Sequence, residues 1–382
     1  MVFIPVLLSV VIWAWLLVGH GAFWRSGPVL GAAYPTRPLK VTVVIPARNE
    51  AEHIADTLRS LLTQQFDGEL RIVLVDDNSS DGTGAVAREL AETDDRLRVV
   101  DGEALKTGWT GKMWAVSQGL RQAETLAADY VLLTDADIVH GSGHLASLVS
   151  RAERDQLSLV SEMVRLRCET LAERATLPAF VFFFQMLYPF RWVCDPGRAT
   201  AAAAGGTMLV SQEALRRVDG VNRVSAELID DVALAREIKC GGHRIWLGHG
   251  DQVVSERTYA GFSDVWEMIA RTAYVQLGYS PWVLMGTCVG MLLLYVEPVL
   301  ASIFATGTLR WAGAVCWTGM AFAFQPTLRR YRRSPVWGLL LPVIGLFYMM
   351  ATIGSAVRFY QGRGGHWKNR SYPASGVRSS RL

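Results

Sequence analysis

Hydrophobic and polar residues are distributed unevenly along the chain, and their pattern divides it into three regions. Residues 2–19 carry no charged side chain and form a first apolar segment. Residues 38–275 mix polar and apolar positions in the way that a water-soluble domain does. Apolar segments return at 282–304, 310–326 and 336–357. We therefore expect a soluble domain that lies between apolar segments.

The first apolar segment has neither the basic start nor the small-residue cleavage site of a signal peptide. We therefore predict a transmembrane anchor over residues 1–24. Arg25, Arg37 and Lys40 follow it, and basic residues favour the cytoplasmic side of a membrane. This predicts that the soluble domain lies in the cytoplasm.

The segments at the other end predict membrane helices over 282–357, followed by a basic tail over 358–382. A basic cluster, "RRYRR", stands at 329–333 between the last two segments. Three full crossings would leave the basic tail on the outer side, against the usual charge rule. One segment is therefore expected to be re-entrant or to lie flat. A candidate is 336–357, which contains three residues that disfavour a regular helix, namely Pro342, Gly345 and Gly354.

Within the soluble region, short β-branched runs alternate with stretches of helical periodicity. The runs that predict strands are 40–47, 70–77, 97–102 and 130–134. The stretches that predict helices are 50–64, 82–92 and 112–127. Alternating strands and helices are typical of an α/β fold with a Rossmann-like, mostly parallel sheet. Ligands bind such sheets beyond the carboxyl ends of the strands.

Two acidic pairs stand at that edge of the predicted sheet. Asp76 and Asp77 end the second strand, and Asp135 and Asp137 follow the fourth. Side chains at positions i and i+2 of an extended segment point the same way, so Asp135 and Asp137 can face one site. Carboxylate oxygens suit Mg²⁺ or Mn²⁺, which add substrate phosphates as further ligands. The alternatives are a solvated turn for the second pair and helix capping for the first.

An aromatic segment, 178–194, is unusual for a soluble domain because it holds five phenylalanines within seventeen residues. One interpretation is a buried core helix. The other is an interfacial segment that lies in the membrane surface and guides a lipid acceptor to the site. On the second interpretation, Phe182, Phe183 and Phe184 contact lipid or the acceptor.

Composition supports membrane segments and excludes other classes. Hydrophobic residues make up 51% of the chain and charged residues 19%, which is too apolar for an ordinary soluble domain. The net charge of +3 gives no reason to expect nucleic-acid binding. The five cysteines are scattered, so we expect neither a disulfide framework nor a zinc site.

Four motifs occur in the order found in family 2 glycosyltransferases of the GT-A fold, and residues 40–275 resemble that family. The motifs are "VIPARNE" (44–50), "VLVDDNSSDGT" (73–83), "GKMWA" (111–115) and "TDAD" (134–137). The resemblance implies a nucleotide-sugar donor, with a UDP-sugar expected, and a divalent metal. It implies contacts to the nucleotide from Pro46, Ala47, Arg48, Glu50, Asp76, Asp77, Lys112 and Asp135. It implies Asp137 as the direct metal ligand, with Asp135 beside it.

The resemblance also implies a general base. "ELIDDVALA" (227–235) matches the family's acidic pair at the start of a helix, with Asp231 as the base and Asp230 in place of the usual glutamate. Such a base would remove a proton from the acceptor hydroxyl during an inverting transfer. The alternative is that either aspartate stabilises the helix N-terminus. Upstream, 201–211 has small residues that allow close approach to a ligand.

The QxxRW motif of polymer-forming members is incomplete here. Arg271 keeps the arginine, but Met268 and Thr272 replace the glutamine and the tryptophan. This departure argues against a processive polymer synthase. Arg271 can still neutralise a diphosphate leaving group, since guanidinium suits phosphate oxygens.

Longer segments resemble the bacterial hopene-associated glycosyltransferases, and they include "LIDDVALAREIKCGGHRIWLG" (228–248) and "MIARTAYVQLGYSP" (268–281). This resemblance implies a hopanoid-like lipid acceptor and a multi-pass protein of the bacterial inner membrane. Two alternatives stay open. One is a sugar transferase that acts on a polyprenyl phosphate, and the other is a membrane scaffold that binds nucleotide without turnover.

Overall fold

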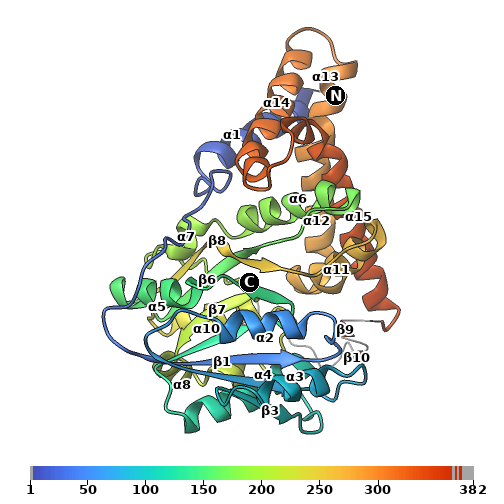
Figure 1. Ribbon diagram of the computed structural model, residues 1–382. Helices are drawn as coiled ribbons and strands as arrows, with labels where there is room; N and C mark the ends of the chain where they lie inside the picture. Colours follow the sequence, from blue (N-terminus) through green and yellow to red (C-terminus); the bar gives the residue numbers. More distant parts are fainter. Residues whose placement is uncertain (1–2, 364–365, 368–369, 372–382) are drawn as a thin grey trace.

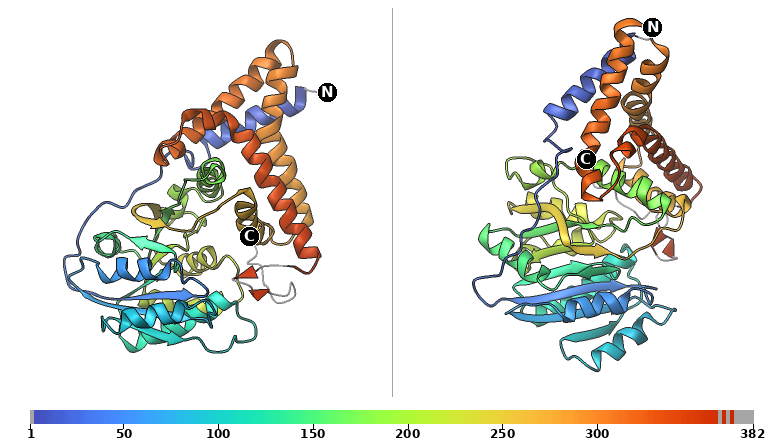
Figure 2. Two further views of the ribbon diagram at one scale, coloured as in Figure 1. Left: turned by 45° about the vertical axis from the view of Figure 1, so that its right-hand side comes forward. Right: turned by 45° about the horizontal axis from the view of Figure 1, so that its top comes forward.

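The computed structural model describes residues 3–363, 366–367 and 370–371. Most of the predicted basic tail, 358–382, lies outside the described residues. Figures 1 and 2 show two parts, a sheet flanked by helices and a bundle of helices set on one side of it. Helix α6 (Leu171–Leu187) lies between the two parts.

The sheet has eight strands in the order β3-β2-β1-β4-β7-β6-β8-β5. β1 pairs in parallel with β2 and β4, β2 with β3, and β6 with β8. β7 is antiparallel to β4 and β6, and β5 is antiparallel to β8. The sheet is therefore mixed and largely parallel. The strands are β1 (Lys40–Ala47), β2 (Glu69–Asp76), β3 (Leu97–Asp101), β4 (Tyr130–Thr134), β5 (Ile138–His140), β6 (Leu159–Arg165), β7 (Thr207–Ser211) and β8 (Ile245–Ser255).

The central strand β1 explains why both faces of the sheet are covered. Seven of its eight residues are buried, because "VTVVIPA" is apolar at nearly every position. Val43 and Ile45 pack into one core cluster with α2, while Val44 packs into another with α4. This period-two alternation is what a strand between two helical layers requires.

Helices and turns of this part follow the predicted βα alternation. They are α2 (Ile54–Leu62), α3 (Thr83–Ala91), α4 (Gly111–Thr125), α5 (His144–Arg154), α6, α7 (Phe190–Cys194), α8 (Gln212–Arg217), α9 (Gly220–Arg223), α10 (Asp230–Cys240) and α11 (Phe262–Gln276). The strands and helices predicted within 40–134 are confirmed, with ends that differ by a few residues.

The helical bundle contains the remaining helices and turns. They are α1 (Phe3–Val18), α12 (Pro281–Met291), the π-helical turn η1 (Leu292–Val296), α13 (Glu297–Phe304), α14 (Gly307–Arg330), the 3₁₀ turn η2 (Pro335–Leu340) and α15 (Leu341–Tyr360). A two-stranded ribbon, β9 (His366–Trp367) and β10 (Arg370–Ser371), follows α15.

Among the described residues, two continuous helices are long and apolar enough to cross a bilayer, Pro281–Phe304 and Pro335–Tyr360. The predicted span 310–326 forms α14, which does not meet both conditions. Helix α1 has 16 residues and so measures about 24 Å, which is shorter than the roughly 30 Å of a bilayer core. A full crossing by α1 therefore stays a prediction.

Residues 336–357 are helical throughout, in η2 and α15, so they lack the break that a re-entrant loop would need, and whether they cross the membrane or lie flat stays a prediction. This segment continues as helix through Pro342, which lies in the first turn of α15 and so breaks no hydrogen bond. The two glycines allow close packing: a Cβ on Gly345 would lie 3.0 Å from the Tyr295 ring, and one on Gly354 would lie 2.7 Å from the Trp266 ring.

The expectation that Phe182, Phe183 and Phe184 contact lipid or the acceptor is wrong for the first two, which are buried. Phe182 is fully buried, and its ring contacts Phe324 of α14 at a centroid distance of 5.1 Å. Phe183 contacts Tyr348 of α15 at 4.8 Å. Both rings fill the junction between α6 and the bundle. Phe184 is partly buried against the sheet-side core.

This packing predicts a large stability loss on truncation. Phe182→Ala should destabilise the protein by about 3–5 kcal/mol, because it leaves a cavity between α6 and α14. Leu187→Ala on the same helix is the matched control, since Leu187 is 54% exposed and should change little. Melting curves of both variants in detergent test this, and equal melting temperatures would contradict a core role for Phe182.

Candidate active site

The loops that follow β1 and β2 are tied together at the carboxyl edge of the sheet. The Asn49 N–H donates to Ser79 Oγ at 3.0 Å, and the Ser80 N–H donates to Asn49 Oδ1 at 2.9 Å. Asn49 adopts a left-handed conformation, with φ of 52°, which asparagine tolerates better than most residues. The expected nucleoside-binding residues Pro46, Ala47, Arg48 and Glu50 therefore lie beside the end of β2.

Asp76 and Asp77 have different surroundings within this pair of loops. Asp76 Oδ1 accepts the Ser79 N–H at 3.0 Å, which is the turn-forming contact considered from the sequence. Neither residue of the pair caps α3, whose N-cap is Gly82; the preceding Asp81 accepts the Thr83 N–H with its Oδ1 at 3.0 Å. Asp77 is fully buried, and its carboxylate lies 3.8 Å from Arg48 Nη1.

A lysine among carboxylates forms the centre of the site. Lys112 lies in the first turn of α4, and its Nζ contacts Asp135 Oδ1 at 3.1 Å and Asp230 Oδ2 at 3.2 Å. Burial opposes the charge of Lys112, but Asp135, Asp230 and Asp231 together raise its pKa above the ordinary value. Pro46, Gly205 and these four residues line one small pocket.

Asp231 is held by two backbone N–H groups. Its Oδ2 accepts from Gly205 at 2.8 Å, and its Oδ1 accepts from Val232 at 2.8 Å. A Cβ on Gly205 would lie 3.3 Å from the same carboxylate, so a larger residue would crowd it. Burial and the charge of Asp230 raise the pKa of Asp231 to about 6, although Lys112 opposes them. A carboxylate with that pKa is ionised at neutral pH and is well matched to proton abstraction.

Asp137 pairs with an arginine that the sequence analysis did not single out. Arg257 follows β8, and its Nε lies 2.9 Å from Asp137 Oδ2. Its Nη2 lies 3.3 Å from Glu50 Oε1. The Glu256 N–H also donates to the Asp137 carbonyl at 2.9 Å, which fixes the loop against β8. The segment "VVSERTYA" carries no motif, so only the three-dimensional contacts reveal Arg257.

Arg257 also lines a cavity of about 550 Å³ that lies between α11 and α15. The predicted Arg271 lies in this cavity and not in the pocket around Lys112. Four arginines and two carboxylates line the cavity: Arg257, Arg271, Arg358, Arg363, Asp264 and Glu267. Its lining therefore has an excess of positive charge, which suits an anionic ligand.

The donor chemistry of Asp135 and Asp137 fits Mg²⁺ or Mn²⁺. Each carboxylate already has a cationic partner, Lys112 or Arg257, so the two negative charges are compensated within the protein. Two protein carboxylates suffice for these ions when substrate phosphates and water complete the coordination. The described residues contain no cluster of three or more acidic, histidine or cysteine side chains that could hold a metal alone.

Residues 42–218 match the model of the family described as Glycosyl transferase family 2. A beta-monoglucosyldiacylglycerol synthase of Trichormus variabilis is 31% identical over 121 residues, which cover 31% of this chain and 25% of that protein. A GalNAc(5)-diNAcBac-PP-undecaprenol beta-1,3-glucosyltransferase of Campylobacter jejuni is 32% identical over 113 residues, which cover 30% of this chain and 34% of that protein. The matches thus span only a quarter to a third of these relatives.

The fold is similar to that of a solved mannosyltransferase from Pyrobaculum calidifontis, in complex with GDP-Man and Mn²⁺. The similarity covers 93% of this chain and 95% of that chain, with a TM-score of 0.54 and 22% identity. At this identity the likeness shows the fold, which is the GT-A fold for the sheet part of the chain.

The surroundings of Asp231 predict a pH profile. The rate should rise as pH increases through about 6, because the raised pKa of Asp231 keeps its carboxyl protonated below that value. Asp230→Asn should move this rising part of the pH profile (its acid limb) to lower pH, because the substitution removes the negative charge that raises the Asp231 pKa. Initial rates between pH 4.5 and 8.5 measure both.

Asp231→Asn is the reference variant and should lower kcat by about 10²-fold or more. An upward shift of the limb in Asp230→Asn would contradict the electrostatic account. An active Asp231→Asn beside an inactive Asp230→Asn would show that the base is the other member of the pair.

Proposed function

We propose that this chain, whose residues 42–218 match the model of Glycosyl transferase family 2, transfers a sugar from a nucleotide-sugar to a membrane lipid. The observation that carries the proposal is the carboxylate and lysine cluster at the sheet edge, which contains Lys112, Asp135, Asp230 and Asp231. It combines a half-buried carboxylate of raised pKa with cations that can face a diphosphate.

In this proposal, the loops after β1 and β2 hold the nucleoside through Pro46, Ala47, Arg48, Glu50 and Asp77. The carboxylate of Asp77 would accept the N–H of a uracil base, and a UDP-sugar is the donor that we propose. Asp76 would support this contact by fixing the turn at Ser79.

Asp231 would take the proton of the acceptor hydroxyl as its oxygen attacks the anomeric carbon. The new carbon–oxygen bond forms on one face while the bond to the diphosphate breaks on the other, which inverts the configuration. The diphosphate leaves with the electron pair, and Lys112 and Arg257 supply positive charge near its path. Bound Mg²⁺ or Mn²⁺, held by Asp137 and Asp135, would supply further charge compensation to the diphosphate.

A membrane setting is supported by the surface of the bundle. Helix α12 has no buried residue, and large apolar side chains such as Trp282, Trp311 and Val343 are more than 60% exposed. Such a surface is costly in water and suits a lipid environment. Arg25, Arg37 and Lys40, which follow α1, favour the cytoplasm for the catalytic part. We therefore propose a protein of the bacterial inner membrane with a cytoplasmic catalytic domain.

For the acceptor, we propose the hydroxyl of a hopanoid, on the resemblance of 228–248 and 268–281 to hopene-associated glycosyltransferases. A second candidate is a phosphate-bearing lipid such as a polyprenyl phosphate. The excess of arginine in the cavity between α11 and α15 favours this second acceptor, because guanidinium groups bind phosphate oxygens well.

The reaction is tested with the purified full chain, UDP- and GDP-sugars, and a panel of hopanoids and polyprenyl phosphates, with mass analysis of the lipid products. Transfer should require Mg²⁺ or Mn²⁺, and Asp137→Ala should abolish it. The same variant should lose Mn²⁺ binding measured by electron paramagnetic resonance, which does not depend on activity. Asp56→Asn, an exposed carboxylate on α2, is the control. Full activity in EDTA would overturn the role of the metal.

Arg271→Gln tests whether the cavity binds the phosphate of a polyprenyl phosphate acceptor. If the cavity binds the phosphate of the acceptor, this variant should raise the KM for a polyprenyl phosphate by about 10-fold and leave donor affinity unchanged. If Arg271 instead faces the leaving diphosphate, UDP affinity should fall and the acceptor KM should not. Arg332→Gln, which is also exposed but lies outside the cavity, is the matched control.

A further inference from the structure

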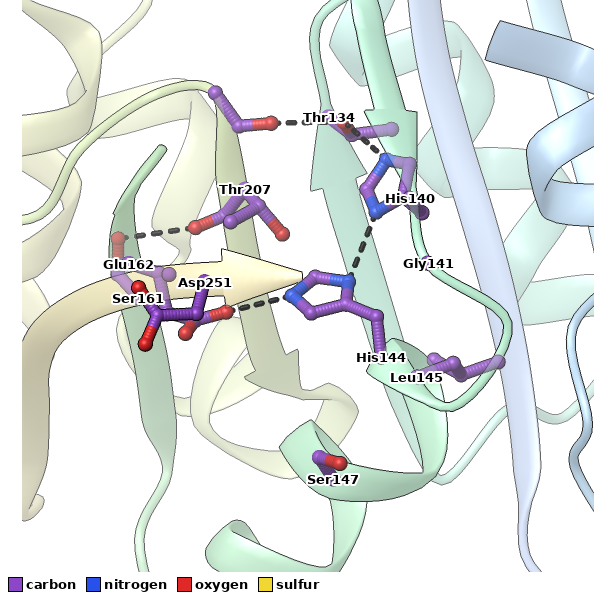
Figure 3. Close-up of polar contacts among 12 residues, drawn as sticks. Thr134, His140, Gly141, His144, Leu145, Ser147, Ser161, Glu162, Thr207 and Asp251 are labelled. Carbon is purple, nitrogen blue, oxygen red and sulfur yellow. Dashed lines mark hydrogen bonds and ion pairs between the residues drawn. The ribbon is translucent and has the colours of Figure 1, made fainter. Parts of the chain in front are cut away.

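A chain of buried polar side chains lies behind the site, and no step of the proposed mechanism uses it. Thr134, His140, His144 and Glu162 are each no more than 3% exposed. Figure 3 shows them in a line that begins on β6, passes through the start of α5 and the end of β5, and reaches the end of β4. Buried polar groups are costly unless they are paired, so such a line needs a reason.

Every neighbouring pair in this line is within hydrogen-bonding distance. Glu162 Oε2 lies 2.6 Å from His144 Nε2, and His144 Nδ1 lies 2.9 Å from His140 Nδ1. His140 Nε2 lies 3.1 Å from Thr134 Oγ1, which donates to the Gly206 carbonyl at 2.8 Å. We name these four side chains the buried polar chain.

The direction of each bond follows from proton counting. The Gly206 carbonyl can only accept, so the single hydroxyl proton of Thr134 is donated to it. Thr134 must then accept from His140 Nε2–H. Burial and the neighbouring His144 lower the pKa of His140 well below its ordinary value, so His140 is neutral and its Nδ1 accepts from His144 Nδ1–H. His144 Nε2 and Glu162 share one further proton. Both ring nitrogens of each histidine and the threonine hydroxyl therefore have a partner.

The buried polar chain ends at two parts of the site. Thr134 directly precedes Asp135 of the acidic loop. Gly206 directly follows Gly205, whose N–H binds Asp231. A second support holds the other side of the same turn, because Ser161 Oγ accepts the Ala204 N–H at 2.9 Å. One hydroxyl therefore connects the strand that carries Asp135 to the turn that holds Asp231.

We propose that the buried polar chain positions the turn at Gly205 and Gly206 against the acidic loop, and so fixes Asp231 relative to the donor diphosphate. Thr134, His140, His144 and Glu162 are positioning residues, because they act through that turn and do not contact substrate. The proposal rests on the proposed function for its catalytic meaning. Small misplacements of a reacting group lower rates steeply, so a rigid support has a clear use.

Thr134→Val tests the link directly, because it keeps the shape of the side chain and removes the hydroxyl. We expect kcat to fall by 10-fold or more with donor affinity within about 2-fold of wild type, since the loops after β1 and β2 are untouched. Thr134→Ser keeps the hydroxyl and should restore most of the rate. Equal losses in the valine and serine variants would overturn the proposal.

A double-mutant cycle separates positioning of Asp231 from a general defect. If Thr134→Val acts through Asp231, it should cost less than 3-fold in an Asp231→Asn background. A cost there as large as in wild type would show that the hydroxyl acts elsewhere.

Glu162 variants test the other end of the buried polar chain. Glu162→Gln can still donate a hydrogen bond to His144 and should retain most of the rate. Glu162→Met cannot donate one and should lose most of the rate.

Deuterium exchange gives a readout that does not depend on catalysis. Loss of the Thr134 hydroxyl should accelerate exchange of the amides in the peptide that covers 201–211, and Thr134→Ser should not. Unchanged exchange in Thr134→Val would overturn the positioning role even if the enzyme is active. If the wild-type protein transfers no sugar while Thr134→Val accelerates exchange as predicted, the proposed function alone would be overturned.

Discussion

The contact of the Lys112 ammonium with the carboxylates around it is the interaction on which the site depends. Asp135 comes from the end of β4, and Asp230 and Asp231 come from the start of α10. Three negative charges brought so close together would repel one another without a cation among them. The N-terminus of α10 favours its two aspartates, while the N-terminus of α4 disfavours Lys112. The carboxylates offset that cost, so the start of α10 stabilises the charge that the start of α4 disfavours.

The reversal of strand direction in the sheet brings these groups together. β7 is antiparallel to β4, and their pairing places Thr134 opposite Thr207. The end of one strand and the beginning of the other therefore meet at the same edge. This is why the turn at Gly205 and Gly206 lies beside the acidic loop, and why one threonine hydroxyl can reach both. An all-parallel sheet would leave the start of β7 at the opposite edge, far from Asp135.

Local signals in the sequence were sufficient for the first half of the sheet. The run "VTVVIPA" is apolar and β-branched, and it forms β1 within the predicted bounds. Asp76 and Asp135 stand at strand ends, as the pattern predicts. Arg257 could not be found in this way, because its partners lie far away in sequence. Neighbouring members of the buried polar chain are only 4 to 18 positions apart, but they form no recognisable motif. The bond from Thr134 to the Gly206 carbonyl spans 72 positions. Arg257 contacts Glu50 across 207 positions, and nothing in the residues around it indicates that contact.

The aromatic segment 178–194 shows that composition alone does not distinguish a buried helix from a helix at a membrane surface. A run such as "FVFFFQML" suits a membrane surface as well as a buried seam between two layers, and the choice depends on what packs against it. Here α14 and α15 supply Phe324 and Tyr348, so the rings of Phe182 and Phe183 are buried. Likewise, Gly345 and Gly354 suggested breaks in a helix, although they provide room for Tyr295 and Trp266.

The same packing has a consequence for access to the site. The Tyr348 hydroxyl donates to the Thr176 carbonyl on α6 at 2.9 Å, and the Ser355 hydroxyl binds the Ala270 carbonyl on α11. These buried bonds hold α15 against two helices of the sheet part, so the bundle cannot rotate freely about it. The arginine cavity is lined by α11 and α15, and it begins at Arg257 beside Asp137. The end of this cavity at Arg257 is therefore held next to the acidic loop by packed helices from both parts of the molecule.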